Sequence, residues 1–234
     1  MSAPQRSTRF LLACGVVPAL FVVVLLVDGA TRRGYQPLHH WGSELSLGDR
    51  GWLQVTNFIV TGVATMLFAL GLRRVLKPGR GAFVGPALTG IFGFCLVIAG
   101  VFSTDPVPGY PPGNSYPPGT TVFPHTLHGF IHNANALPTF AALALAPLVL
   151  ARRFAREPGW RGFMWYSLVS GLLTLVSFFL ALRAEAIGQE AGTLATSLHG
   201  LWQRISIALG FGWFSVLSVL MLRAVANRPV PTRR

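Results

Sequence analysis

The chain has few charged side chains. Asp, Glu, Lys and Arg make up 11% of its 234 residues, less than half of the roughly 25% that is usual in soluble domains. A soluble fold needs charges to cover its surface, so this shortage excludes an ordinary soluble enzyme. Hydrophobic residues make up 52% of the chain, which excludes a disordered chain and predicts an integral membrane protein.

The chain also has only two cysteines, Cys14 and Cys95. Cys14 is about five residues into the first apolar stretch and Cys95 about fourteen residues into the third, so the two would lie at different depths in a membrane. A disulfide does not span such a difference. We therefore expect both cysteines to be buried as small hydrophobic side chains.

Long apolar stretches take the place of the missing charges. Each is long enough to cross a hydrocarbon core of about 30 Å as a helix that rises about 1.5 Å per residue. Six such stretches and their connections use the whole chain, so we predict an all-α, polytopic membrane helix bundle that forms a single membrane domain, residues 1–234. The predicted transmembrane helices are residues 10–27, 53–72, 81–102, 128–151, 162–182 and 203–222.

The net charge of +12 is distributed systematically along the chain. Of the 19 Lys and Arg residues, 14 lie on one side of the predicted bundle, whereas six of the seven acidic residues lie on the other. Basic residues accumulate in cytoplasmic loops, so we expect both termini in the cytoplasm. The basic excess then sets the topology, and we expect membrane lipids, not nucleic acid, as partners; no protein partner or oligomeric state is predicted.

Polar side chains recur at helical spacing within four of the predicted helices. A polar side chain that faces lipid is costly, so these faces should point into the bundle. Helix packing through small hydroxyl side chains explains the Ser and Thr rows, but it explains the histidines less well. The positions are Gln54, Asn57, Thr61 and Thr65; His128, His132, Asn135 and Thr139; Ser167, Ser170, Thr174 and Ser177; and His199, Gln203, Ser206 and Gly210.

All histidines lie on the predicted extracytoplasmic side or in the outermost turns of the helices. Neutral histidine does not determine topology, so the positive-inside rule does not require this segregation. The pattern predicts a polar site that faces outward. The six residues are His39, His40, His125, His128, His132 and His199.

His128 and His132 lie one turn apart on the same helix face, a spacing that suits chelation of a first-row metal. His199, at the entrance of the last helix, would supply a third nitrogen, and Asp105 or Glu44 a carboxylate. Three protein ligands with an open fourth position form a catalytic zinc site, at which bound water ionises near pH 7. The predicted reaction class is hydrolysis, with Asp105 and Glu44 as catalytic residues.

Three other interpretations of the histidines stay open. The stricter metalloprotease pattern is absent, because a glycine, Gly129, follows His128. His128 and His132 would serve structure alone if they formed hydrogen bonds with residues such as Asn57. One of the pair together with His199 would provide the two axial ligands of a haem in an electron-transfer protein. An organic site would use histidine as an acid, a base or an anion-binding group.

Arg204 is the one charged residue about a turn below the outer start of the last predicted helix. We expect its side chain to pair with Asp105 or Glu44. An arginine among histidines equally suits an anionic headgroup or a phosphate. The predicted ligand-binding residues are Arg204, Gln203, Asn57 and Asn135.

Two outer segments flank these candidates. Residues 103–125 contain seven of the 17 prolines, which predicts an extended lid or a spacer with polyproline character. Residues 41–48 predict a short amphipathic segment that lies on the membrane, with Glu44 either pointing inward or solvated. Asp105 either starts a turn before Pro106 or holds a carboxylate at the mouth of the bundle.

Four motifs together resemble a known family. They are SELSLG at 43–48, FSTDP at 102–106, LHGFIHN at 127–133 and LWQRI at 201–205. With these motifs in this order, the chain resembles, over nearly its whole length, the domain-of-unknown-function family 998 of prokaryotic membrane proteins. The resemblance implies a bacterial or archaeal inner-membrane location and no assigned activity. It also implies an outer constellation of Glu44, Asp105, His128, His132, His199 and Arg204.

A looser likeness links the chain to the membrane hydrolases that include alkaline ceramidases and adiponectin-receptor relatives. Those proteins also combine Ser, Asp and a His-x-x-x-His pair around zinc, but they have seven spans and a different order of motifs. Two function classes are therefore compatible with the sequence. One is a metal-dependent hydrolase that acts on a lipid or another amphiphile, and the other is a small-molecule or lipid binding or transport protein without catalysis. A bis-histidine haem protein is a further alternative.

Overall fold

The computed structural model describes residues 3–79, 81–116 and 126–227. Six helical spans in this part of the chain are long and apolar enough to cross a membrane. Within the same ranges no strand is present, and a single isolated bridge joins Val107 to Tyr110. The predicted all-helical architecture with six membrane spans is therefore confirmed.

The first span is a helix broken by one 3-10 turn. Pro18 lies in the first turn after the break, where its missing N–H costs no helical hydrogen bond. The Ala19 amide donates to Ser215 Oγ at 3.1 Å, which ties the broken region to the last helix. The three parts of this span are α1 (Ala3–Ala13), η1 (Cys14–Val16) and α2 (Val17–Thr31).

The remaining spans are unbroken helices, and most of them extend beyond the predicted boundaries. The prediction ended each helix near its first charged residue, whereas backbone hydrogen bonding continues the helix into the polar interface. The clearest case is α6, which continues eight residues beyond the predicted end at 182 and includes Glu185. The five helices are α3 (Gly51–Val75), α4 (Val84–Val101), α5 (Leu127–Phe154), α6 (Arg161–Glu190) and α7 (His199–Ala226).

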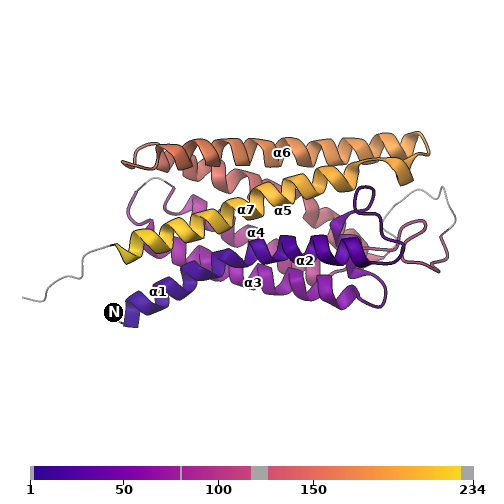
Figure 1. The fold of residues 1–234 in the computed structure, drawn as a ribbon, viewed down its shortest axis with the longest axis horizontal. Coiled ribbons are helices and arrows are strands. Elements are labelled where there is room, and N and C mark those ends of the chain that lie inside the picture. The colour runs from indigo at the N-terminus through magenta and orange to yellow at the C-terminus, as the bar shows by residue number, and fades with distance from the viewer. Residues whose placement is uncertain (1–2, 80, 117–125, 228–234) are drawn as a thin grey trace, which may run out of the picture.

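The six spans form a closed ring. α3, α4, α5 and α6 each pack against the next helix in the chain, and the first span packs against both α3 and α7. Short connections between antiparallel neighbours favour this order. In Figure 1 the helices run along one common axis, and the start of α1 and the end of α7 lie at the same end of the bundle. We call the opposite end, where residues 32–50, 102–116 and 191–198 lie, the outer end.

Glycines allow a close helix contact between α3 and α4. A Cβ atom on Gly62 would lie 2.6 Å from the carbonyl oxygen of Gly93, and a Cβ on Gly93 would lie 2.7 Å from the carbonyl oxygen of Gly62. Both distances are too short for a side chain. The two backbones therefore approach through small residues, as is common between membrane helices.

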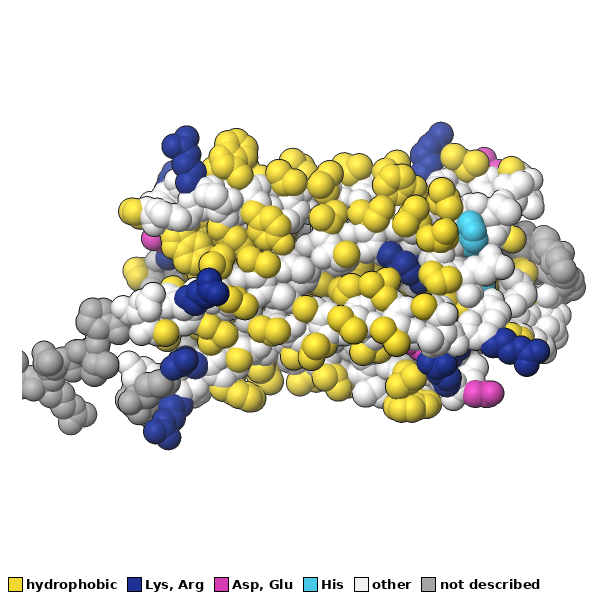
Figure 2. Space-filling model, in the orientation of Figure 1, with side chains coloured by type: hydrophobic (Ala, Val, Ile, Leu, Met, Phe, Trp, Pro, Cys, Tyr) yellow, Lys and Arg dark blue, Asp and Glu magenta, His cyan; other side chains and the backbone are white. Residues whose placement is uncertain are grey.

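Large hydrophobic side chains cover the outside of the ring. Leu20, Val23, Phe94 and Leu172 are each about half exposed, and Figure 2 shows hydrophobic side chains along the length of the visible face. Such a surface is unfavourable in water and favourable against lipid acyl chains.

The first outer connection does not lie on the surface as predicted. It contains η2 (Gly42–Ser46), in which Gly42, Glu44 and Leu45 are buried. The amphipathic-surface prediction for residues 41–48 is therefore wrong, because side chains from α7 draw this segment into the outer end of the ring. Of the two alternatives for Glu44, the inward-pointing one is correct. A second 3-10 helix, η3 (Leu194–Thr196), lies between α6 and α7.

The described half of the proline-rich connection, residues 103–116, also packs on the outer end. Tyr110 is almost completely buried and lies with its ring edge toward Tyr35 at a centroid distance of 5.3 Å. The Asn114 side chain donates to the carbonyl oxygens of Val107 and Pro111 at 2.9 Å each. This half is thus a packed cover. Residues 117–125 of the predicted lid or spacer, with His125, lie outside the described residues.

Candidate functional site

The ring encloses a cavity of about 220 Å³ toward its outer end, and all six spans contribute to its lining. Its deeper wall is formed by aromatic rings, among which Phe140 and Phe178 stack with their centroids 4.0 Å apart. The outer wall is polar, because the polar lining residues lie near the outer ends of their helices. The deeper rings include Phe92, Phe140, Phe178 and Phe211, and the polar residues include Trp41, Ser43, Thr104, His132, Asn133, Asn135, Glu185 and Gln203.

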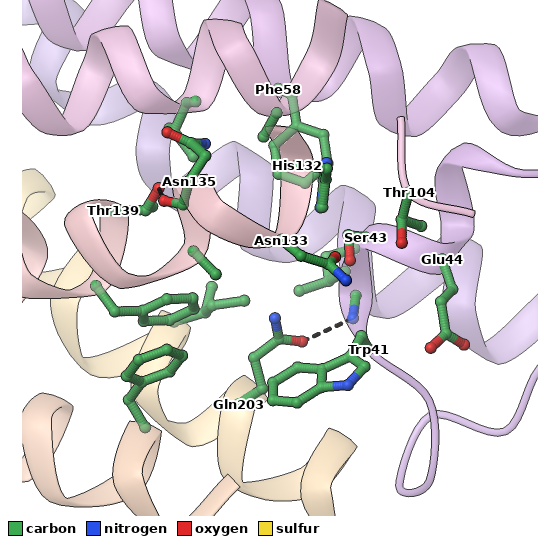
Figure 3. Close-up of a pocket in the computed structure, with 18 of the residues that line it drawn as sticks. Trp41, Ser43, Glu44, Phe58, Thr104, His132, Asn133, Asn135, Thr139 and Gln203 are labelled. Atoms are coloured by element: carbon green, nitrogen blue, oxygen red, sulfur yellow. Dashed lines mark hydrogen bonds between the residues drawn. The ribbon is translucent and has the colours of Figure 1, made fainter. Parts of the chain in front are cut away.

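Trp41 and Gln203 lie side by side at the polar wall (Figure 3). Gln203 Oε1 accepts a hydrogen bond from the Gly42 amide at 2.7 Å, so α7 holds the start of η2. The Trp41 indole N–H donates to Glu185 Oε1 at 2.8 Å. The first outer connection is therefore tied to α6 as well, and the predicted binding residue Gln203 does line the cavity.

His132 and Asn135 line the cavity from α5 and also hold α5 against α4. His132 Nδ1 lies 2.7 Å from the carbonyl oxygen of Phe102, and its ring meets the Phe58 ring edge-on. The Asn135 side chain donates to the carbonyl oxygen of Cys95 at 2.8 Å. These two side chains of the predicted face therefore point inward, as their helical spacing predicts, whereas His128 of the same face is exposed.

Glu44 is buried at the outer end of the cavity, with 3% of its surface exposed. Its Oε2 atom accepts no hydrogen bond from the part of the chain that the structure describes. Burial raises the pKa of this carboxyl to about 8, although the charge of Arg204 acts in the opposite direction. In Figure 3 the carboxyl group lies apart from Gln203 and Asn133.

His40 lies beside Glu44, with Nδ1 3.8 Å from Oε2. Burial, together with the charge of Arg204 and His39, lowers the pKa of His40 to about 4. At pH 7 the imidazole is therefore neutral and the carboxyl is protonated. This pair has the spacing of a salt bridge without its charges.

Asp105 supports the start of α5 and does not line the cavity. Its two carboxylate oxygens accept hydrogen bonds from the backbone amide and the hydroxyl of Thr126, at 3.0 and 2.6 Å. Thr126 in turn caps α5 by accepting from the Gly129 amide. A Cβ atom on Gly129 would lie 2.1 Å from Asp105 Oδ2. The site of the predicted catalytic carboxylate is thus a helix-capping contact.

Arg204 does not form the predicted ion pair. Its guanidinium donates to the carbonyl oxygens of His40 and Gly200, at 2.9 Å each, and to the hydroxyl of Tyr35. Among the salt bridges of the described ranges, none includes Arg204. Its hydrogen bonds are taken up by one backbone carbonyl of the first outer connection, one backbone carbonyl of α7 and a tyrosine hydroxyl. Arg204 is buried and is not part of the cavity lining.

The three predicted metal ligands lie in different surroundings. His128 is exposed and packs on the Phe102 ring, whereas His199 is buried, with Nδ1 2.6 Å from Ser197 Oγ. Only His132 of the three lines the cavity. Within the described chain, no group of three or more His, Cys, Asp or Glu side chains is arranged to hold a metal ion. The zinc site gains no support from this arrangement, and the haem alternative stays a prediction.

Asn57, the remaining predicted ligand-binding residue, is also absent from the lining. Its side-chain amide donates to the carbonyl oxygen of Phe21 at 3.2 Å and to Gln54 Oε1 at 3.3 Å. Asn57 thus holds α2 against α3, and its neighbour Gln54 reaches the cavity instead.

The sequence prediction missed Trp41, Asn133 and Glu185 in the polar wall. Trp41 directly precedes the SELSLG segment, but no spacing in the sequence marks it as a cavity residue. Asn133 stands within the LHGFIHN motif, directly after His132. Glu185 continues the polar face of α6 two turns beyond Ser177. The boundary at residue 182 hid that continuation.

Comparison with known proteins places the chain in a family. The family model described as "Protein of unknown function (DUF998)" matches residues 16–220. No curated protein and no solved structure matches the chain. The chain belongs to the DUF998 family, as its four motifs indicate.

Proposed function

We propose that this member of the DUF998 family is a multi-pass membrane protein that binds a small amphiphilic molecule in the cavity of the ring. The observation that carries the proposal is the polarity gradient of the lining, from stacked phenylalanines to Trp41, Gln203 and Glu185. Enclosed sites with an apolar wall and a few convergent polar groups are typical ligand sites. The apolar part of the ligand would lie against the Phe140–Phe178 pair.

The cavity volume limits the ligand. At about 220 Å³ the cavity has the volume of about seven water molecules in the liquid, each of which occupies about 30 Å³. It is smaller than the roughly 300–1,000 Å³ of sites for drug-sized molecules. The proposed ligand is therefore a molecule of about seven non-hydrogen atoms, or one end of a longer amphiphile.

The proposal includes the orientation in the membrane. Most of the described Lys and Arg residues lie at the end of the bundle where α1 begins and α7 ends, and six of the seven acidic residues belong to the outer end. By the positive-inside rule, both termini would be cytoplasmic and the cavity would be close to the extracytoplasmic face of a prokaryotic inner membrane.

The proposal is binding without catalysis. The two predicted catalytic carboxyls are not arranged to act on the same bound molecule. Asp105 holds the start of α5, while Glu44 is buried beside His40. The hydrolase predicted from the histidines needs a ligand set that the described side chains do not provide. Binding needs only the cavity.

The test is calorimetric titration of hexan-1-ol into the protein in lipid nanodiscs, with protein-free nanodiscs as the blank. Ala136 lines the cavity from α5, whereas Ala134 on the same helix is exposed. An Ala136→Phe side chain would occupy the cavity, so its affinity for hexan-1-ol should fall at least about tenfold. The matched Ala134→Phe variant should bind as the wild type does.

Two results would contradict the proposal. The first is a wild-type titration that gives no heat beyond the blank. The second is equal affinity of the wild type and Ala136→Phe, with both showing the same thermal stability, because the alcohol would then bind elsewhere.

A further inference from the structure

We infer that the cavity selects an amphiphile with a cationic, ammonium-type head group. The inference rests on the proposed function and specifies the ligand class of the same site. The lining contains two carboxyl side chains, Glu44 and Glu185, and no Lys or Arg among its described residues. The outer end as a whole holds six acidic and five basic residues, and only acidic ones from this set line the cavity.

Glu185 provides the first contact for an ammonium group. One of its carboxyl oxygens accepts the Trp41 indole N–H at 2.8 Å, which fixes the side chain at the polar wall. The other oxygen accepts no hydrogen bond from residues of the described chain. An ammonium group has three donors and no acceptor, so it matches an oxygen that still lacks a donor.

Glu44 provides a second, buried carboxyl in the same lining. Its Oε2 atom is buried and receives no hydrogen bond from the described side chains or backbone. The charge of Glu185 acts on it and raises the pKa of Glu44 beyond the effect of burial. When Glu44 ionises, a cation bound at this wall would relieve the repulsion between the two carboxylates, whereas an anionic head group would increase it.

Trp41 adds an aromatic face to the same wall. Its ring lines the cavity and lies 5.2 Å from the His199 ring by centroid distance. Indole is the side chain with the strongest cation–π attraction, worth about 0.5–2 kcal/mol. The tryptophan thus favours the same head group as the carboxyls.

Arg204 does not reverse this preference. Both of its terminal nitrogens are engaged with the His40 and Gly200 carbonyls and the Tyr35 hydroxyl, and its side chain is outside the lining. The anionic headgroup that an arginine among histidines suits in the sequence is therefore not favoured by the geometry.

The affinity for an ammonium ligand should depend on pH. The titratable and charged groups around Glu44 are His40, Tyr35, Tyr110, Arg204 and Glu185. The pKa of His40 is lowered to about 4, and burial raises the pKa of both tyrosines. Glu44, with its pKa raised to about 8, therefore ionises between pH 6 and 9. Hexylammonium stays charged over this range, since alkylamines resemble lysine, with a pKa of about 10.4.

The experiment titrates three ligands of equal chain length, hexylamine hydrochloride, hexan-1-ol and sodium hexanoate, into the protein in nanodiscs of zwitterionic lipid at pH 7.5. We expect hexylammonium to bind about tenfold more tightly than hexan-1-ol, and hexanoate to bind more weakly than both. Glu185→Gln should reduce the ratio of hexylammonium to hexan-1-ol affinity about tenfold. Glu190→Gln, an exposed carboxyl on the same helix, should leave this ratio unchanged.

A second series follows the wild type and Glu44→Gln from pH 6 to 9. The affinity for hexylammonium should rise with pH in the wild type and rise less in Glu44→Gln. The affinity for hexan-1-ol should not depend on pH in either protein. This series tests the inference even if Glu185→Gln does not fold.

Equal affinity for hexylammonium and hexan-1-ol, with no pH dependence, would overturn the inference and leave the proposed function intact. Tighter binding of hexanoate would overturn it too. Failure of all three ligands to bind would instead reject the proposed function on which the inference rests.

Discussion

Burial shifts the proton occupancy of Glu44 and His40 in opposite directions. The pKa of Glu44 rises to about 8 and that of His40 falls to about 4, so both groups are neutral at pH 7. A neutral pair avoids the large cost of a buried charge. The sequence predicts that Glu44 is a site residue, but its protonation follows from burial of residues 41–48, which no local pattern of the sequence indicates.

Glu44 should make the protein less stable at alkaline pH. Its pKa is above the ordinary carboxyl value in the folded state, so the stabilising contribution of the proton is complete below about pH 4.5 and is lost as pH rises through about 8. The wild type should therefore unfold at a lower temperature at pH 9 than at pH 6. Glu44→Gln should flatten this dependence, measured by thermal unfolding in detergent, and Glu190→Gln should not. An unchanged slope in Glu44→Gln would show that the carboxyl ionises freely.

Asp105 and Gly129 should act on stability. A Cβ on Gly129 would collide with Asp105 Oδ2 at 2.1 Å, so Gly129→Ala must displace the carboxylate from Thr126. We expect a loss of about 1–3 kcal/mol in the free energy of unfolding, from a buried hydrogen-bonded charge and a helix cap. Gly212→Ala is the matched control, because nothing lies within 4 Å of its added Cβ. Equal stability of the two variants would mean that the cap does not hold α5.

At the scale of elements, the helices were predictable and their contacts were not. Long runs without charge predict the spans, because only a helix satisfies its backbone in lipid. The extension of α6 to Glu190 was missed because the charge pattern marks the lipid boundary and not the end of the helix. The burial of η2 was missed because it depends on Gln203 and Arg204, which are some 160 residues away in the chain.

The segment around η2 should loosen when its contacts with α7 are removed. Arg204→Met deletes the hydrogen bonds to His40, Gly200 and Tyr35 and leaves a side chain of similar length. Amide hydrogen exchange in residues 35–46 should accelerate at least about tenfold, because each lost charge-assisted hydrogen bond is worth about 1.5–3 kcal/mol. Arg183→Met, which removes an exposed arginine of α6, is the control. Unchanged exchange in Arg204→Met would show that Gln203 alone holds the segment.

At the scale of the whole molecule, the polar faces of the helices converge on one cavity. Gln54, His132, Asn135 and Gln203 line it, as their helical spacing predicts. Asn57 shares the spacing but bonds to the Phe21 carbonyl. Periodicity predicts the inward face of each helix but not the neighbour that takes up a particular hydrogen bond. The order of the helices in the ring and the position of the cavity could therefore not be predicted from the sequence.

The orientation of the ring predicts which surface residues face the outside of the cell. Asp49 is exposed at the outer end, and Glu157 is exposed between α5 and α6 at the opposite end. In intact cells a membrane-impermeant maleimide should label Asp49→Cys but not Glu157→Cys. After the cells are lysed it should label both. The wild type, with its two native cysteines, is the background control, and the reverse labelling pattern would invert the proposed topology.

The central claim is that a small amphiphile binds inside the ring with its apolar end against the phenylalanines. The most direct test is bromine anomalous diffraction from crystals soaked with 6-bromohexan-1-ol, which carries bromine at its apolar end. The account predicts one anomalous peak beside Phe140 and Phe178 in the wild type and its loss in Ala136→Phe crystals. Bromine peaks confined to the lipid-facing surface of the wild-type helices would contradict the claim.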